Sequence, residues 1–288
     1  MMLRIRTIAR LTGIREATLR AWERRYGFPR PMRSEGNNYR VYSREEVESI
    51  RRVARLIQLD GLAVSEAIAQ VLATPVKSMP RAERFQERFW AAVMLLDGDE
   101  VSRVLDEAQE AMDVDTYCDD FLMPLLREMS ARLDIAREHL ASGFIRQRLR
   151  QVLTSVESPA NGPRALLACP PQDFHEGGLL GLGVQLKRQG WRVTMLGADT
   201  PAEALRSARE QLHPDMVALS FVQRREPDEF MTLLSDALRA CAPTPVVVGG
   251  PGAREHLKAT FTLGAQYAES SQELIALWNQ VRTAQNRP

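Results

Sequence analysis

Two proline-containing breaks divide this chain into three stretches whose apolar residues follow different rhythms. The first break, residues 74–80 (TPVKSMP), and the second, residues 157–163 (ESPANGP), each hold two prolines. Proline and glycine interrupt regular elements, so both segments are predicted to be linkers. The length of 288 residues is enough for two or three domains. We expect domains at residues 1–73, 83–156 and 164–288, with linkers at 74–82 and 157–163.

The composition is that of a globular protein. It is 44% hydrophobic and 26% charged, with a net charge of +1, which excludes collagen-like, disordered and highly charged chains. No run approaches the roughly 18 consecutive apolar residues of a membrane-spanning helix, and the first ten residues lack the apolar segment of a signal peptide. A cytoplasmic protein with no membrane partner is expected. Three widely spaced cysteines, Cys118, Cys169 and Cys241, predict neither a disulfide framework nor a zinc site.

The near-neutral total hides a strong asymmetry. Residues 1–60 contain 14 arginines, no lysine and seven acidic residues, a formal charge of +7, so the remaining 228 residues carry −6. A basic segment of this kind is typical of proteins that bind a polyanion, because each neutralised phosphate releases counterions. Arginine also favours bidentate recognition of phosphate or guanine.

The two later stretches differ in their apolar spacing. In residues 83–156 the apolar side chains recur at helical intervals, as in Val101, Val104, Leu105 and Ala108, which predicts a bundle of four helices. Beyond residue 163 the rhythm changes, and short β-rich runs alternate with helical stretches, which predicts a parallel sheet with crossover helices. The runs are at residues 165–169, 192–196, 216–222 and 245–250.

The basic segment has helix-turn-helix spacing. Residues 7–13 and 14–26 are predicted to form two short helices separated by a turn at Gly13. Leu19, Trp22 and Tyr26 give the second helix one buried face. The candidate DNA-binding residues lie off that face and are Arg15, Thr18, Arg20, Arg24 and Arg25.

A hairpin and a capped helix are predicted to follow. Residues 29–42 place the turn formers Gly36-Asn37-Asn38 between β-capable flanks, as in a wing. Ser43 and Glu46 form a capping box that opens a helix running to about Leu59, and Ser65 is expected to cap another. The alternative is a generic small helical domain with a solvated arginine face.

With these features this first quarter of the chain resembles the MerR-type winged helix-turn-helix. The resemblance lies in IARLTGI, LRAWERRYG and the wing NYRVYS followed by a helix. It implies binding to a palindromic operator in double-stranded DNA as a dimer. Arg15, Arg20, Arg24 and Arg25 would belong to the recognition helix, and the wing would contribute Asn38, Tyr39 and Arg40.

A second motif follows the first strand of the predicted sheet. Asp173-x-His175-x-x-Gly178 lies where a doubly wound fold binds ligands. A neutral imidazole can offer one nitrogen to a metal while a nearby carboxylate accepts the proton on the other and fixes the tautomer. Gly178 lets a bulky ligand approach the backbone. Taken alone, an Asp-x-His pair is more often a satisfied loop contact.

Two further elements strengthen the ligand interpretation. Ser220 and Val222 end the third run, and Gly249-Gly250 ends the fourth. The set resembles the DxHxxG…SxL…GG signature of cobalamin-binding domains, with Val222 in place of leucine. The resemblance implies a Rossmann-like α/β fold in which His175 is the lower axial ligand of cobalt and Asp173 its hydrogen-bond partner. Ser220, Gly249 and Gly250 would line the slot for the displaced nucleotide tail.

The three parts together resemble the CarA branch of the CarA/CarH group of repressors of carotenoid genes. Light-sensing members bind adenosylcobalamin under a Trp-x9-Glu-His motif in the bundle. Glu138-His139 matches the end of that motif and is a candidate cofactor contact, but Glu128 stands at the Trp position and Met129 at a neighbouring His position. A carboxylate is no aromatic lid, and a thioether is a poor substitute for imidazole on cobalt(III). Glu138-His139 can also be a surface pair.

The leading hypothesis is a homo-oligomeric repressor of light-inducible carotenoid genes. Its cobalamin-type module would act without strict need for adenosylcobalamin or methylcobalamin. The alternatives are an adenosylcobalamin-dependent light-sensing repressor, a corrinoid methyl carrier, for which a substrate domain is lacking, and a metal- or drug-responsive activator, for which clustered cysteines are lacking. An acidic antirepressor protein that imitates DNA is a further predicted partner. No enzymatic activity is expected.

Overall fold

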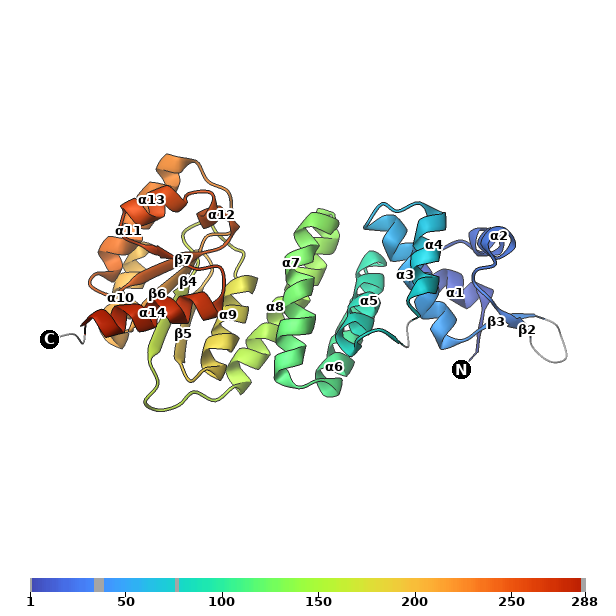
Figure 1. Ribbon diagram of the computed structural model, residues 1–288, viewed down its shortest axis with the longest axis horizontal. Helices are drawn as coiled ribbons and strands as arrows, with labels where there is room; N and C mark the ends of the chain where they lie inside the picture. Colours follow the sequence, from blue (N-terminus) through green and yellow to red (C-terminus); the bar gives the residue numbers. More distant parts are fainter. Residues whose placement is uncertain (1, 34–38, 76–77, 286–288) are drawn as a thin grey trace. The chain divides into compact units, whose positions relative to one another are not determined.

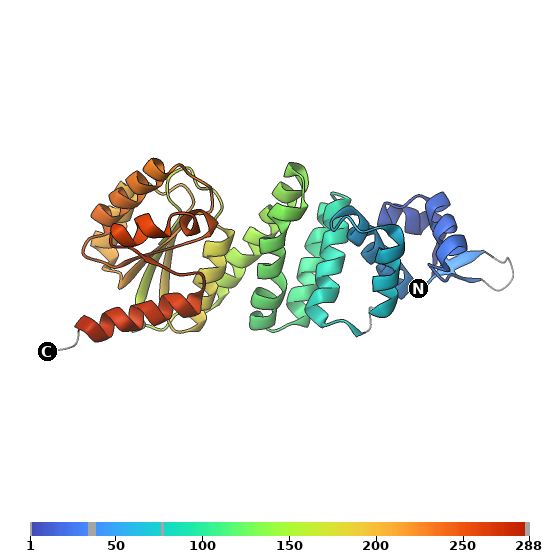
Figure 2. The ribbon, with the colours of Figure 1, turned by 45° about the horizontal axis from the view of Figure 1, so that its top comes forward.

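The computed structural model describes residues 2–33, 39–75 and 78–285 (Figures 1 and 2). The chain divides into two compact units, Met1–Ile145 and Arg146–Pro288. The border falls within α8 (Ile135–Ser155), near the end of the predicted bundle. The domain limits expected from the sequence stay predictions.

The first unit begins with four helices and a small antiparallel sheet. The predicted helices of the helix-turn-helix are present, and Gly13 and Gly27, at φ +68° and +63°, end the first two. The sheet has the order β1-β3-β2, and β2 and β3 form the two sides of the predicted wing. Asn38 and the rest of the wing turn lie outside the described residues. The elements are β1 (Leu3–Arg4), α1 (Ile5–Thr12), α2 (Glu16–Tyr26), β2 (Met32–Arg33), β3 (Arg40–Tyr42), α3 (Arg44–Gln58) and α4 (Val64–Ala73).

These elements share one apolar core. Leu19 is fully buried and Trp22 is 6% exposed, as the spacing on α2 predicts. Half of the predicted capping box of α3 is confirmed, because the Ser43 hydroxyl accepts the Glu46 N–H at 3.1 Å. The Glu46 carboxylate does not complete the box and accepts the N–H of Arg30 at 2.9 Å. The predicted cap at Ser65 is wrong, because the N-cap lies two residues earlier, at Ala63, and α4 begins at Val64. The Ala63 N–H donates to the Glu66 carboxylate at 3.4 Å.

Four helical elements follow, as the apolar spacing predicts. They pack around large side chains such as Phe89, Tyr117 and Phe121, and the Tyr117 hydroxyl donates to the carbonyl of Leu105 at 3.3 Å. The second unit continues from α8. The elements are α5 (Arg81–Met94), α6 (Gly98–Ala111), a π-helical segment η2 (Thr116–Leu122) that runs directly into α7 (Met123–Arg132), and α8.

The second unit is a five-stranded parallel sheet with the order β5-β4-β6-β7-β8. All four predicted strands are present, and a short fifth strand was not predicted. The strands are β4 (Arg164–Ala168), β5 (Arg192–Gly197), β6 (Met216–Ser220), β7 (Val246–Gly249) and β8 (Gln266–Tyr267). The helices are α9 (Gly177–Arg188), α10 (Ala202–Leu212), α11 (Pro227–Cys241), α12 (Pro251–Arg254), α13 (Leu257–Thr262) and α14 (Ser271–Gln285).

Helices cover both faces of this sheet (Figure 1). Alternate residues of each strand point to opposite faces. Leu166 and Val217 pack with α10 and α11, whereas Ala165 and Leu167 pack with α9 and α14. The chain reverses its winding direction between β4 and β6, and ligands of such sheets bind at the carboxyl ends of the strands at this point.

Within the described ranges, no helix has the length and apolar character that crossing a membrane requires.

The cap of α3 gives the first prediction. Ser43→Ala removes the acceptor for the Glu46 N–H and should destabilise the start of α3 by about 1 kcal/mol, which speeds amide exchange there about fivefold. Hydrogen–deuterium exchange of the full chain measures this. Ser65→Ala is the matched control, because Ser65 is exposed inside the first turn of α4 and caps nothing. Equal effects of the two substitutions would contradict the assignment of the cap.

Candidate functional site

One face of α2 carries exposed arginines. The side chains of Arg24 and Arg25 are exposed near its carboxyl end, and Arg15 is exposed just before its start. Arg20 is also exposed but pairs with Glu16 at 3.0 Å within the helix. Thr18 is half-buried. The helix therefore presents guanidinium groups to solvent on the side opposite its buried face, an arrangement suited to DNA phosphates and base edges.

The wing is joined to this helix. Arg40 on β3 pairs with Glu23 on α2 through Nε and Oε2 at 2.7 Å, and this contact raises the pKa of Arg40. Arg40 is therefore engaged within the fold, whereas the sequence suggested only a DNA contact. Tyr39 is 58% exposed, and the Arg4 guanidinium lies 5.6 Å from its ring centre. Arg4 is a surface cation of this region that sequence reasoning missed, because it precedes the first helix.

In the second unit Asp173 ties together two loops at the carboxyl ends of β4 and β6. Its side chain is fully buried. One carboxylate oxygen accepts the N–H groups of Val222 at 2.6 Å and Gln223 at 3.1 Å. The other oxygen accepts the N–H of His175 at 3.2 Å and contacts the His175 ring nitrogen Nδ1 at 3.3 Å. A buried carboxylate with this set of donors is satisfied without a cation partner.

His175 is presented to solvent by the same loop. Its side chain is 52% exposed, and the Asp173 carboxylate assigns the proton to Nδ1. Among the described residues, Nε2 has no partner, so its lone pair is available to an external Lewis acid. A Cβ at Gly178 would meet nothing within 4 Å, so there is open space on this side of the loop. A free imidazole nitrogen beside open space could hold the metal of a large cofactor at this loop.

Two glycines beyond β7 are required by the backbone itself. Gly250 has φ +92°, and a Cβ there would lie 2.4 Å from the carbonyl oxygen of Phe221. A Cβ on Gly252 would lie 2.3 Å from the carbonyl oxygen of Gln223. The segment Phe221–Gln223, in which the N–H groups of Val222 and Gln223 bind Asp173, therefore lies between the Asp173 loop on one side and the Gly250–Gly252 backbone on the other. Gly252 was not among the predicted site residues, although its spacing two residues after Gly250 is visible in the sequence.

The remaining signature residues lie at the same edge. Ser220 ends β6 and is half-buried, directly beside Gly249 in the register of β6 and β7. A Cβ at Gly249 would lie 2.9 Å from the carbonyl oxygen of Ala268. Val222 contributes its backbone N–H to Asp173. Because the contact is made by backbone, valine serves there as well as the leucine of the signature.

The four bundle residues at the positions of the cofactor motif differ in exposure. His139 is 76% exposed and its Nδ1 lies 3.0 Å from the carboxylate of Glu138. Met129 is only 2% exposed and belongs to the bundle core, while Glu128 is half-buried. A thioether buried among apolar neighbours packs the bundle and presents no donor atom to a ligand.

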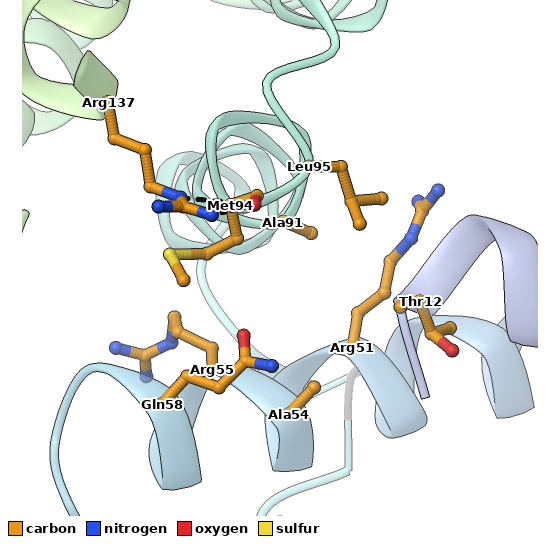
Figure 3. Close-up of a pocket in the computed structure, with 10 residues that line it drawn as sticks. Thr12, Arg51, Ala54, Arg55, Gln58, Ala91, Met94, Leu95 and Arg137 are labelled. Carbon is orange, nitrogen blue, oxygen red and sulfur yellow. Dashed lines mark hydrogen bonds between the residues drawn. The ribbon is translucent and has the colours of Figure 1, made fainter. Parts of the chain in front are cut away.

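The cysteines and an arginine-lined cavity of the first unit form no second site of this kind. Cys169 directly follows β4 and is buried. Its burial raises the pKa of the thiol to about 12, so the thiol stays protonated. A cavity of about 230 Å³ between α3 and α5 is lined by Arg51, Arg55 and Arg137 (Figure 3). Their guanidinium groups lie apart, and each is bound within the protein, Arg137 to the carbonyl of Met94. This cavity has no convergent donor set.

The loop contacts of Asp173 give the second prediction. Asp173→Ala leaves the part-buried N–H groups of Val222 and Gln223 without their acceptor and should lower the free energy of opening there by about 2–4 kcal/mol. His175→Ala removes a half-exposed ring and should change it by less than about 0.5 kcal/mol. Amide exchange of the full chain compares the two. Similar losses in both variants would contradict the structural role assigned to Asp173.

Known proteins match both units. Residues 3–73 match the MerR HTH family of regulatory proteins, and residues 163–275 match the B12 binding domain. The chain is 74% identical over 288 residues, the full length of both proteins, to the HTH-type transcriptional repressor CarA of Myxococcus xanthus. It is 38% identical to the repressor CarH of the same organism over 275 residues. This alignment covers 88% of this chain and 90% of CarH.

One solved structure has a similar fold over much of the chain. The monomethylamine corrinoid protein of Methanosarcina barkeri is 14% identical, covers 69% of this chain and 99% of its own, and gives a TM-score of 0.51. At this identity the likeness concerns the fold alone. It agrees with the expected helical bundle followed by a Rossmann-like domain.

Both of these relatives are HTH-type transcriptional repressors, and this chain carries a MerR HTH match followed by a B12-binding match. The chain therefore belongs to the family that includes CarA and CarH, the MerR-type HTH transcriptional repressors with a B12-binding domain.

Proposed function

We propose that this chain represses light-inducible carotenoid genes in the cytoplasm by binding a palindromic operator as a homo-oligomer. The observation that carries DNA binding is the exposed arginine face of α2 beside the wing, in a segment with a charge of +7. Arg15, Thr18, Arg20, Arg24 and Arg25 are the proposed contacts of the helix. Tyr39 and Arg40 are those of the wing, with Asn38 beyond the described residues. Full-length identity to CarA supports the repressor role.

The second unit is proposed to be an assembly module of the cobalamin type that acts without strict need for cobalamin. Asp173, His175, Gly178, Ser220, Val222, Gly249 and Gly250 form its proposed ligand site. A bound corrinoid, with adenosyl or methyl as its upper group, would supply a cobalt ion that accepts the lone pair of an imidazole. His175 would offer Nε2, and Asp173 would hold the proton on Nδ1.

The independence from cobalamin rests on the bundle. Met129 is buried and Glu128 carries a carboxylate, so neither side chain supplies an aromatic cover or an imidazole to an upper ligand. Glu138 and His139 remain proposed contacts of the cofactor, but they already contact each other. Regulation by a protein partner then replaces direct light sensing. An acidic antirepressor that imitates DNA phosphate would compete for the arginine face of α2.

Arg24 tests DNA binding. It is exposed and has no ion-pair partner among the described residues. Arg24→Ala should weaken binding to a duplex of unselected sequence roughly tenfold and reduce the slope of log K against log [salt] by about 1. Fluorescence anisotropy at several salt concentrations measures both. An acidic competitor should lose affinity for the same variant.

Arg103→Ala is the control, because Arg103 is an arginine of the bundle with a 59% exposed side chain. A slope near zero for the native chain would exclude electrostatic DNA binding. Loss of DNA binding with full retention of the acidic competitor would place the two partners on separate surfaces.

Ligand dependence is tested by size and spectrum together. The full chain, with and without adenosylcobalamin, in the dark and after illumination, should elute at the same mass from gel filtration. A ligand-dependent and light-reversible increase in mass would favour the light-sensing alternative. After desalting, retained corrinoid with an imidazole-ligated spectrum, lost in His175→Ala, would establish the ligand site independently of assembly.

A further inference from the structure

A buried arginine clamps the loop that carries His175. The side chain of Arg225, in the segment between β6 and α11, is only 4% exposed. Its Nη2 donates to the carbonyl of Pro171 at 2.7 Å, and its Nη1 pairs with Glu229 in the first turns of α11. Its Nε is buried and has no hydrogen-bond partner among the described residues. Pro171 lacks an N–H, so this carbonyl is its only backbone group that can take part in a hydrogen bond.

This arrangement is poor as a device for stability. Burying a guanidinium carries a desolvation cost, and an unpartnered N–H adds to it. Glu229, the carboxylate that compensates the charge, is itself 48% exposed. An apolar side chain of similar length would pack there without those costs. What the guanidinium provides is a directional bond to one chosen carbonyl.

The backbone of Arg225 is itself fixed from the other side. Its carbonyl accepts a hydrogen bond from Nε2 of His256 at 3.0 Å. The His256 ring stacks on Phe230, with centres 4.6 Å apart and planes at 24°. Phe230 is 1% exposed and belongs to the core between the sheet and α11. Arg225 is thus anchored on rigid structure before it reaches the loop.

The loop then has two anchors from the same segment. Asp173 receives the N–H groups of Val222 and Gln223, and Pro171 receives the guanidinium of Arg225. Asp199, which follows β5, also holds the loop, since its carboxylate accepts the Gln172 N–H at 2.7 Å and its own N–H donates to the Asp173 carbonyl at 3.1 Å. Arg225 adds the contact at Pro171, ahead of these, and so restrains the direction in which the loop enters Asp173 and His175. The imidazole of His175, which follows two residues after Asp173, inherits that orientation.

We propose that Arg225 is a positioning residue for His175, one that fixes the tautomer and direction of the imidazole by holding the carbonyl of Pro171. The inference deepens the proposed ligand site, and its purpose as a cobalt contact rests on that proposed function. The orientation itself is a property of the chain without any ligand. It is therefore open to a measurement in which no corrinoid takes part.

The experiment uses the full chain labelled with ¹⁵N-histidine. The chain has four histidines, so the ring nitrogen signals can be assigned by single substitution. In the native chain His175 should show one tautomer, protonated at Nδ1. Arg225→Met keeps the length and the burial but loses the donors, and should give averaged His175 signals that resemble those of Asp173→Asn. Arg225→Lys, which can still reach one acceptor, should restore part of the native signal.

Arg239→Met is the matched control. Arg239 lies on α11, the helix that follows Arg225; its side chain is 74% exposed and pairs with Asp236. Its variant should keep the native His175 spectrum. Amide exchange at Gln172 and Asp173 should rise about tenfold in Arg225→Met and stay unchanged in Arg239→Met. Native His175 signals in Arg225→Met would overturn the proposal, even if the loop exchanged faster.

Adenosylcobalamin, added in the dark, separates this inference from the proposed function. If the native chain retains it, Arg225→Met should retain it at least about tenfold more weakly or with less imidazole ligation, and unchanged binding would overturn the positioning role. If the native chain retains no adenosylcobalamin, the proposal that this site binds a corrinoid is contradicted. The tautomer comparison then still decides whether Arg225 positions His175.

Discussion

The second unit depends on one buried carboxylate. Asp173 gathers backbone N–H groups from the ends of two neighbouring strands and holds the ring of His175 with the same group. Parallel strands end at a common edge, and their loops carry many unpaired donors there. A single acidic side chain that accepts several of them closes the edge and leaves one imidazole nitrogen facing outward. The free ring nitrogen of His175 at this edge is therefore a consequence of the hydrogen bonds that join the loops.

Much of the fold was predictable because it rests on local rules. Helix ends at Gly13 and the cap at Ser43 follow from backbone preference and hydrogen bonding, and the four main strands follow from short β-rich runs. The fifth strand has two residues and no apolar run, so pairing with β7 defines it. The start of α4 was misplaced because Ser65 looks like a cap, whereas Glu66 binds the chain one turn earlier.

The site was predictable only in part. Motif spacing indicates which residues meet at the sheet edge, and His175 and Asp173 do meet there. Spacing does not indicate that Arg40 pairs with Glu23, since the partners come from a strand and a helix 17 positions apart. Nor does it indicate the bond between Arg225 and Pro171. Both contacts form because tertiary packing brings a cation next to an acceptor that is distant in sequence.

The close approach at Gly250 and Gly252 has a consequence for how such sequences evolve. Each glycine is demanded by a carbonyl oxygen less than 2.5 Å from where a side chain would begin. Selection for folding alone is therefore sufficient to keep them, with or without a ligand in the neighbouring space. A descendant that abandoned its cofactor would still carry the glycine part of the signature. Glu128, half-buried on the bundle, meets no such backbone constraint, so loss of a cofactor would be recorded at such a position first.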